Sequence, residues 1–399
     1  MVISGVGIVT ALGNGWKANA EGFRAGRSAF RPVRAFDVSR QRVKQAAEVD
    51  LPQEIPKTRL SAREEGRLDR ASKLLLLAAQ EAWEAADWSR SEDLPLVLGT
   101  TSGGMRMGEE YYRQATERPF CDTRQPTRVV HYQPQSQALQ LQNARGFSGP
   151  ITIIANACAS GANAIGHAWS LIRNGEAERV LTGGYDALSQ LVFSGFDSLQ
   201  ALSPTSCRPF DAARDGLALG EGAAVLALET LENARKRGAK IVAEICGYGA
   251  ATDCHHLTQP HPEGDAALMA MQKACEMGEI AAEQVGYINA HGTGTALNDG
   301  AEAMAINRWA GNCAGEMRVS STKASIGHLL GAAGAVEGAV CAIALQEQWL
   351  PPTMTTENVD PICKFNFVRA PVDAKFEYAL SNSFGFGGSN ASLLFRRFE

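Results

Sequence analysis

The sequence predicts an α/β protein, because strand-like and helix-like segments alternate along the chain. Apolar, β-branched runs indicate strands at 2–10, 95–100 and 150–156. Between them, the sequences at 70–86 (RASKLLLLAAQEAWEAA) and 135–143 indicate helices. These five segments, taken in order, are typical of a sheet covered by helices.

Two pairs of segments in the two halves of the chain resemble each other. VISGVGIVTALG at 2–13 is similar to AEICGYGAATD at 243–253, and GEGAAVLAL at 220–228 is similar to GGSNASLLF at 387–395. One interpretation is a duplicated design whose halves, 1–240 and 241–399, meet near residue 240. The other is chance, since glycine-rich strand ends look alike.

Composition limits the function. With 45% hydrophobic residues and 399 residues in all, the chain buries a large core as one big domain or two fused ones. A net charge of -5 gives no basic face for nucleic acid. The N-terminus has no basic segment before its apolar run, so it predicts a first strand instead of a signal peptide. Residues 146–172 carry no charge but are too polar for lipid, so we expect no membrane span.

The nine cysteines form no C-x-x-C pair and have no histidine at zinc-finger spacing. They indicate reduced thiols in a cytoplasmic protein. DCHHLTQPHPEG at 253–264 raises the question of a metal, but its prolines and glycine favour a mobile surface loop. We therefore predict no metal site.

One cysteine, Cys158, has an unusual setting in IIANACASG at 153–161. It lies where a strand ends and a helix begins, so the helix N-terminus would lower its thiol pKa and make it a nucleophile. Small neighbours leave room for a carbonyl group, and backbone N–H groups there suit an oxyanion hole. The alternative is an ordinary buried cysteine.

Two histidines follow strand-like or glycine-rich segments. His291 stands in YINAHGTGTALND, where Thr293 and Thr295 suit hydrogen bonds to a polar ligand. His328 follows Lys323 in SSTKASIGHLLG, and Glu337 lies further along. If His328 begins a helix, the helix N-terminus lowers its pKa and keeps the imidazole neutral. Either histidine also fits a structural role.

Small residues predict a close helix pair. Gly327, Gly331, Gly334 and Gly338 would share one face of the helix after His328. The helix after Cys158 offers a matching face with Ser160, Gly161, Ala164 and Gly166. Near the C-terminus, Phe384 and Phe386 lie among glycines in SNSFGFGGSN, which suits a gate over a pocket or an ordinary turn.

The order of these motifs resembles that of the β-ketoacyl-acyl carrier protein synthases of type II, elongating condensing enzymes of the thiolase superfamily. The motifs are ACASG, HGTGT, KASIGHLLGAAGAVE and GFGGSN, and the similarity covers nearly the whole chain. The resemblance implies a five-layered αβαβα thiolase fold made of two duplicated halves. The first half would carry the cysteine and the second the two histidines.

The resemblance also implies roles for individual residues. Cys158 matches the nucleophile that holds an acyl thioester, and His291 and His328 match the pair that acts on the malonyl unit. Lys323 and Glu337 match supporting charged groups. Thr293 and Thr295 would lie along the pantetheine arm, and Phe386 would gate access to the cysteine, with Phe384 beside it as a substrate-binding candidate. No cofactor is implied, since phosphopantetheine arrives on the carrier protein.

The same resemblance separates neighbouring enzyme classes. Thiolases carry a second reactive cysteine near the C-terminus, which the GFGG segment here lacks, and initiating synthases have asparagine where this chain has His328. Chain-length subunits lose the nucleophile. The short PTSCRPFD segment and Ala296, where proline is common, leave the pathway open: fatty acid elongation, or a polyene or polyketide pathway with a cysteine-less partner subunit.

The implied partners are an acyl carrier protein and a second subunit, either an identical copy or a related chain. Because such carriers are acidic, we expect a basic patch beside the entrance. Lys57, Arg59, Arg63, Arg67, Arg70 and Lys73 are close in sequence. Arg63, Arg67 and Arg70 are the candidate docking residues, although a solvated helix face explains them equally well.

Overall fold

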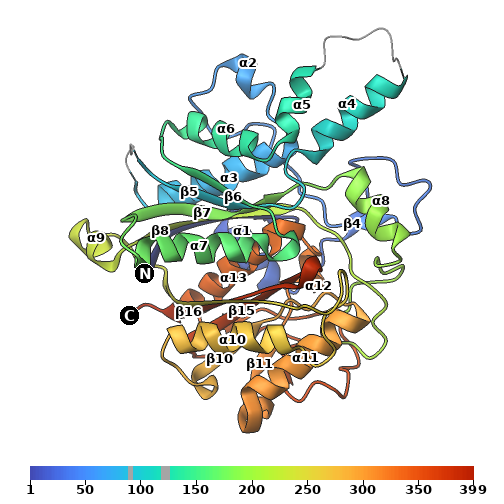
Figure 1. The fold of residues 1–399 in the computed structure, drawn as a ribbon, viewed down its shortest axis with the longest axis vertical. Helices are drawn as coiled ribbons and strands as arrows, with labels where there is room; N and C mark the ends of the chain where they lie inside the picture. Colours follow the sequence, from blue (N-terminus) through green and yellow to red (C-terminus); the bar gives the residue numbers. More distant parts are fainter. Residues whose placement is uncertain (89–92, 118–125) are drawn as a thin grey trace.

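The computed structural model describes residues 1–88, 93–117 and 126–399. Its secondary structure forms five layers (Figure 1). The outer helices α3 (Arg70–Ala85) and α6 (Gln135–Arg145) cover a first set of strands. The central helices α7 (Ser160–Arg173) and α13 (Ala333–Glu347) separate it from a second set. The other outer layer holds α10 (Asp265–Met277) and α11 (Ala296–Ala310). The expected layered α/β fold is confirmed.

Among the described residues, the sheet has 12 strands, and five strands from each half follow the same order, while β13 (Asn366–Phe367) pairs with β11 and β2 (Gly13–Asn14) pairs with β1. The first half has β6-β5-β7-β8-β1 and the second has β11-β10-β15-β16-β9. In the first set, β5 is parallel to β6 and β7, whereas β8 is antiparallel to β7 and β1. In the second set, β10 is parallel to β11 and β15, whereas β16 is antiparallel to β15 and β9. The strands are β1 (Val2–Thr10), β5 (Leu96–Gly99), β6 (Ile151–Ile154), β7 (Arg179–Asp186), β8 (Gly222–Glu229), β9 (Ala243–Thr252), β10 (Val285–Asn289), β11 (Arg318–Ser320), β15 (Tyr378–Gly385) and β16 (Ser389–Arg397).

This topology explains the internal sequence similarity. The segments 2–13 and 243–253 contain β1 and β9, the first strand of each half, and 220–228 and 387–395 overlap β8 and β16, the fifth strand of each half. The similar segments therefore occupy equivalent positions in two duplicated halves. Residue 240 lies between α9 (Leu231–Lys236) and β9, and β1 pairs with β9 to join the two sets.

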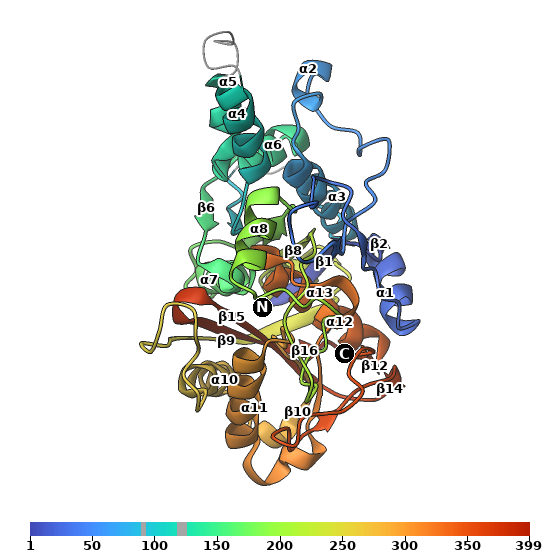
Figure 2. The same ribbon diagram turned by 90° about the vertical axis from the view of Figure 1, so that its right-hand side faces the viewer.

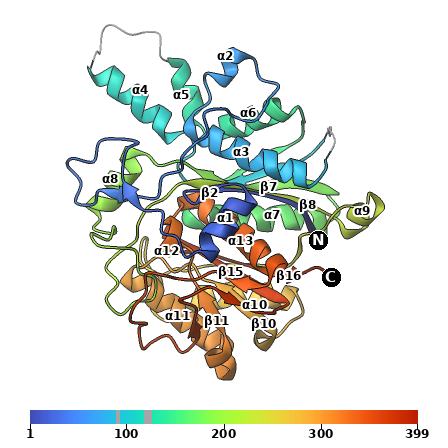
Figure 3. The same ribbon diagram turned by 180° about the vertical axis from the view of Figure 1, so that it is seen from behind.

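Shorter elements surround these layers. α4 (Met105–Glu117), α5 (Pro126–Tyr132) and α2 (Ala62–Glu65) stand out at one end of the molecule (Figure 2), and both chain termini lie on one side (Figure 3). The others are β2 (Gly13–Asn14), α1 (Trp16–Arg24), β3 (Arg31–Pro32), β4 (Gln45–Ala46), α8 (Gln190–Ser198), α12 (Lys323–Ile326), β12 (Trp349–Leu350), β13 (Asn366–Phe367) and β14 (Val372–Asp373), with single 3₁₀ turns at Ala157–Ala159, Ala282–Gln284, Gly311–Glu316, Leu330–Ala332 and Phe386–Gly388.

The two central helices pack almost backbone to backbone. A methyl group added to Gly161 would lie 2.7 Å from the Ala335 nitrogen, and one added to Gly334 would lie 2.7 Å from the Ala162 nitrogen. Glycine is required at both positions, because larger residues would push the helices apart. The predicted close approach is confirmed.

The expected glycine stripe is only partly correct. Gly327 ends α12 with φ +74°, and Gly331 lies in a 3₁₀ turn before α13. Gly166 faces the Tyr248 ring of β9 instead of α13. His328 therefore lies in the break between α12 and the 3₁₀ turn that precedes α13.

Leu330–Glu347 is apolar and long enough to cross a membrane. In the structure 89% of this segment is buried inside the protein. It forms the 3₁₀ turn and helix at the centre of the fold, between the two sets of strands.

Candidate active site

Cys158 lies on a tight turn between β6 and α7. The preceding residue, Ala157, has φ +57°, which is unusual for a residue other than glycine. Hydroxyl groups stabilise this turn, since Thr101 Oγ1 donates to the Ala157 carbonyl at 3.1 Å and Ser160 Oγ donates to the same oxygen. The strained turn places the Cys158 side chain, 7% exposed, at the wall of a cavity.

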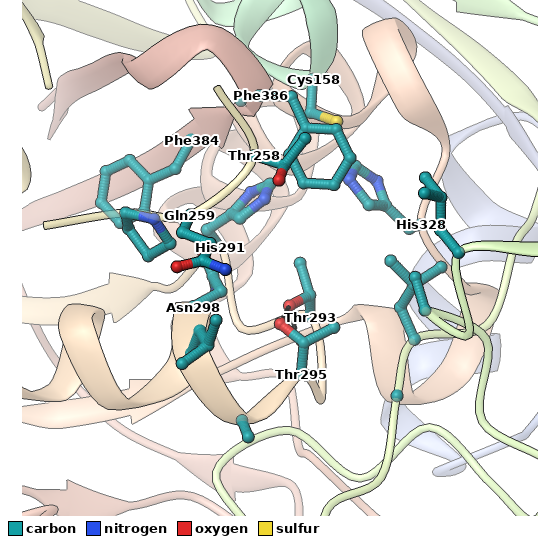
Figure 4. Close-up of a pocket in the computed structure, with 18 of the residues that line it drawn as sticks. Cys158, Thr258, Gln259, His291, Thr293, Thr295, Asn298, His328, Phe384 and Phe386 are labelled. Atoms are coloured by element: carbon teal, nitrogen blue, oxygen red, sulfur yellow. Dashed lines mark hydrogen bonds between the residues drawn. The ribbon is translucent and has the colours of Figure 1, made fainter. Parts of the chain in front are cut away.

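This cavity has a volume of about 420 Å³ and brings most of the predicted residues together. Figure 4 shows the Cys158 sulfur and the rings of His291 and His328 directed into the same space. Thr293, Thr295, Phe384 and Phe386 also line it. Cys158 comes from the first half of the chain and the histidines come from the second, so the site exists only where the halves meet.

The hydrogen bonds of the two histidines indicate which ring nitrogen carries the proton. His328 Nδ1 accepts from the Leu330 backbone N–H at 3.2 Å. His291 Nδ1 lies 3.4 Å from the Lys323 ammonium nitrogen, which only donates. The proton of each neutral ring is therefore on Nε2. The rings meet edge to face, with their centroids 5.2 Å apart.

Burial keeps both imidazoles neutral. It lowers the pKa of His291 and of His328 well below 6.5, and the nearby Lys323 charge acts in the same direction. The predicted neutral state of His328 holds, but the predicted cause is wrong. His328 precedes the 3₁₀ turn at Leu330–Ala332 and does not begin a helix.

Lys323 and Glu337 form a buried ion pair beside His291. Their side chains are 1% and 2% exposed, and the Lys323 ammonium donates to a Glu337 carboxylate oxygen and to the His291 carbonyl. Burial raises the pKa of Glu337 to about 7, although Lys323 opposes the shift. The pair holds the backbone and the ring of His291 at once.

The Cys158 thiol is the clearest correction to the sequence-based expectation. Burial raises its pKa to about 12, and the attraction of Lys323 offsets this only in part. Desolvation is the largest influence on this pKa, and the resting thiol is neutral. Its proton has to leave as the sulfur reacts.

The HGTGT loop is held by two buried carboxylates that the sequence interpretation missed. Glu302 accepts from the His291 and Gly292 amides at 2.8 and 2.7 Å, and Asp299 accepts from the Thr293 amide at 2.9 Å. Thr293 and Thr295 share a hydroxyl hydrogen bond of 2.9 Å. Asp299 and Glu302 follow the loop closely in sequence, a signal that they cap it.

The segment 253–261 is a second omission. The sequence predicts a surface loop at 253–264, and residues 254–259 are indeed exposed. What the sequence did not indicate is that Asp253 and the residues from His256 to Pro260 also line the cavity. The loop also contacts the phenylalanine segment, because the Gly387 N–H donates to the Leu257 carbonyl at 2.7 Å.

The histidines of this loop raise the question of a metal site. Among the described residues, however, there is no cluster of three or more potential metal ligands.

The two phenylalanines lie differently. Phe384 is buried against the His291 ring, with centroids 5.6 Å apart. Phe386 is 42% exposed and stacks on Phe196 of α8, with centroids 6.0 Å apart. Phe386 therefore lies between the cavity and solvent, the position that a gate requires.

The candidate docking residues do not flank this cavity. Arg70 forms an ion pair with the fully buried Glu221 and donates to the Val49 carbonyl, so it is a structural residue. Arg63 and Arg67 are exposed, in and just after α2. However, α2 lies at the end of the molecule away from α11, whose first turn lines the cavity (Figure 2). Arg63 and Arg67 therefore do not line the cavity of their own chain, and their role in carrier docking stays a prediction.

The neutral histidines give a testable pH dependence. The unfolded chain protonates each ring below about pH 6.5, whereas the folded protein does not, so the free energy of unfolding falls as the pH drops. Each ring should cost about 1 kcal/mol between pH 6.5 and 5.5. Urea unfolding of the wild type and of His328→Asn at both pH values isolates one ring. An equal decrease in both proteins would show that folded His328 protonates normally.

Comparisons with known proteins agree with this geometry. Residues 1–234 match the model of the β-ketoacyl synthase N-terminal domain, and residues 242–357 match that of the C-terminal domain. A 3-oxoacyl-[acyl-carrier-protein] synthase 2 from Synechocystis sp. is 36% identical over 418 aligned residues, which cover 100% of this chain and 98% of the relative. One from Staphylococcus aureus is 35% identical with the same coverage.

Solved structures with the same fold are also similar over the whole chain. The ishigamide ketosynthase/chain length factor has a TM-score of 0.91 and 30% identity, and the alignment covers 100% of this chain and 99% of that one. A β-ketoacyl synthase from Burkholderia phymatum has a TM-score of 0.89 and 33% identity, with the same coverage. Motifs, topology and sequence identity agree: the chain belongs to the β-ketoacyl synthase family of condensing enzymes.

Proposed function

We propose that this protein condenses an acyl thioester with malonyl-acyl carrier protein, releasing carbon dioxide and forming β-ketoacyl-acyl carrier protein in fatty acid elongation. The observation that carries the proposal is the pair of neutral imidazoles, each with Nε2–H as its donor, in one cavity with a buried thiol. The relatives named 3-oxoacyl-[acyl-carrier-protein] synthase 2 support the same reaction.

In the first step, Cys158 takes the acyl group. The sulfur attacks the thioester carbonyl, the new S–C bond forms, and the carrier thiolate leaves and takes the thiol proton. Because the resting thiol is neutral, the transfer creates no lasting charge in the buried site. The Cys158 amide and amides of the Phe386 segment are the proposed oxyanion donors.

In the second step, the malonyl carboxylate leaves as carbon dioxide and its bonding electrons form an enolate. Decarboxylation needs no base, because no proton is removed from the malonyl unit. It needs hydrogen-bond donors for the enolate oxygen, and the two imidazole N–H groups supply them. The enolate carbon then attacks the acyl carbonyl, the C–Sγ bond breaks, and the Cys158 thiolate takes up a proton from solvent, which replaces the one that left with the carrier in the first step. Thr293 and Thr295 are proposed to bind the pantetheine arm.

A panel of acyl-carrier thioesters, from short to long, tests this function. Intact mass should show one acyl group on Cys158, and added malonyl carrier should convert it to a β-ketoacyl product with release of carbon dioxide. Absence of loading by every donor would contradict action of the chain alone. The chain length that loads fastest would define the acyl preference.

A polyene or polyketide pathway is the second candidate. The similar structures include the ishigamide ketosynthase/chain length factor and the ketosynthase ApeO in complex with its chain length factor ApeC, the latter 29% identical with a TM-score of 0.86. In that case a related, cysteine-less subunit is the proposed partner in place of a second copy. Loading that appears only after such a subunit is added would favour it over fatty acid elongation.

Arg63 and Arg67 remain the proposed docking residues for the acidic carrier. Since Arg63 and Arg67 do not line the cavity of their own chain, the carrier held there would serve the cavity of a second subunit. Reversing both charges to glutamate should raise the apparent KM for the carrier about tenfold at low salt, mainly through slower association.

The docking test needs a control at a distant basic site. Arg235→Glu and Lys236→Glu on α9 change the net charge equally and should leave the KM unchanged. An unaltered KM in the Arg63/Arg67 variant would remove α2 from the docking surface. Thermal unfolding should match the wild type in both, because these side chains are exposed.

A further inference from the structure

Asp186 is a buried carboxylate at the end of β7 that takes no part in the steps above. It is 0% exposed. Its Oδ1 atom accepts from the Thr100 hydroxyl, the Ser102 hydroxyl and amide, and the Gly103 amide, at 2.7 to 3.3 Å. Its Oδ2 atom accepts from the Thr101 amide at 2.9 Å and the Gly331 amide at 2.7 Å. A carboxylate with so many donors holds its surroundings firmly.

The bond to Gly331 matters most, because it crosses from the first half of the chain to the segment that follows His328. A methyl group added to Gly331 would lie 2.4 Å from the Thr101 nitrogen, so this segment is packed directly on the Thr100–Thr101 backbone. Both segments are tied to the same carboxylate oxygen.

The residue before Gly331 is strained. Leu330 has φ +53°, a conformation that costs on the order of 1–3 kcal/mol for a residue other than glycine. In this conformation its N–H is directed at His328 Nδ1, 3.2 Å away. The surrounding structure has to stabilise the strained turn. The Gly331–Asp186 hydrogen bond holds the residue directly after Leu330 and can therefore do so.

From this geometry we propose that Asp186 is a positioning residue that fixes the Nε2–H tautomer of His328. By holding Gly331, it keeps Leu330 in the left-handed conformation, and the Leu330 N–H then occupies His328 Nδ1. Without that donor, the ring gains the Nδ1–H tautomer and presents a lone pair to the substrate oxygen. The inference rests on the proposed function, since the tautomer affects catalysis only if His328 donates to the malonyl unit.

Asp186→Asn tests the inference with little change in shape, because an amide keeps one acceptor oxygen and replaces the other by a donor. Imidazole ¹⁵N shifts of histidine-labelled protein report the tautomer, and His328→Asn assigns the signal. We expect wild-type His328 to be Nε2–H and the Asp186→Asn ring to gain Nδ1–H character. His291 should not change, because Lys323 occupies its Nδ1.

Single-turnover kinetics separate the two chemical steps in the same variant. Acyl loading on Cys158 should stay within about threefold of the wild type, whereas condensation should fall about 10²-fold, the loss typical of one missing oxyanion donor. Asp186→Glu keeps two acceptor oxygens and should recover part of this loss. Thr182→Val is the matched control, since Thr182 lies on the same strand and is buried.

Several outcomes would overturn the inference. An unchanged His328 tautomer in folded Asp186→Asn, or an equal loss in loading and condensation, would give Asp186 a purely structural role. If Asp186→Asn does not fold, Asp186→Glu takes its place in the comparison, and lower condensation with an unchanged His328 tautomer would contradict the proposal. A proton on His328 Nδ1 in the wild type would contradict it as well. If no carrier substrate is extended, the proposed function fails, while the tautomer comparison still tests Asp186.

Discussion

Replacing Cys158 by alanine should abolish covalent acyl loading and reduce condensation by at least about 10⁴-fold, as expected when the nucleophile of a covalent mechanism is removed. Water cannot substitute for the thiol, because the acyl group has to wait in the cavity for the second thioester. Intact mass after incubation with an acyl carrier measures loading, and single-turnover product formation measures condensation.

The chain offers a matched control for this substitution. Cys275 is also buried and lies in α10, and it does not line the cavity. Cys275→Ala removes the same atom and should load as the wild type does. Acyl mass on Cys158→Ala would contradict the assignment and point to another nucleophile. Both variants should unfold within about 1.5 kcal/mol of the wild type, because each loses one small buried group.

Replacing Lys323 by methionine should have the second largest effect, on stability and catalysis together. Glu337 would remain buried without its cation, which typically costs 3–5 kcal/mol. Its pKa, already about 7, would rise further. His291 would also lose the donor at Nδ1 that fixes its proton on Nε2. Condensation should therefore fall about 10²- to 10³-fold.

A double variant separates the two effects. Lys323→Met with Glu337→Leu leaves no unpaired charge, and replacing a buried ion pair by apolar residues is often neutral or stabilising. Urea unfolding should show most of the lost stability restored, while condensation stays low because His291 still lacks its donor. Recovery of condensation in the double variant would mean that Lys323 acts only through stability.

The sequence predicted the elements well because they depend on local patterns, and it predicted the convergence of the site through the order of its motifs, which resembles that of a known family. The strand expected at 2–10 is β1, and the helix expected at 70–86 is α3, which ends at Ala85. Cys158 and the two histidines meet in one cavity as the resemblance implied. Equivalent strands in the two halves account for the weak internal similarity.

The errors concern properties that depend on packing between distant segments. The thiol pKa was predicted from the helix N-terminus next to it, but burial by both halves decides its direction. Arg70 looks like a surface cation in sequence, because its partner Glu221 is 151 residues away. The 253–261 segment has a loop composition, and nothing local indicates that it folds over the cavity.

The backbone contact between α7 and α13 has a consequence for recombination between relatives. Cys158 belongs to one half and the histidines to the other, and the contact between halves includes main-chain atoms of Gly161 and Gly334. Main-chain contacts do not depend on which larger side chains a relative carries elsewhere. Hybrid chains joined near residue 240 should therefore keep the spacing of nucleophile and imidazoles, provided that these two glycines are retained.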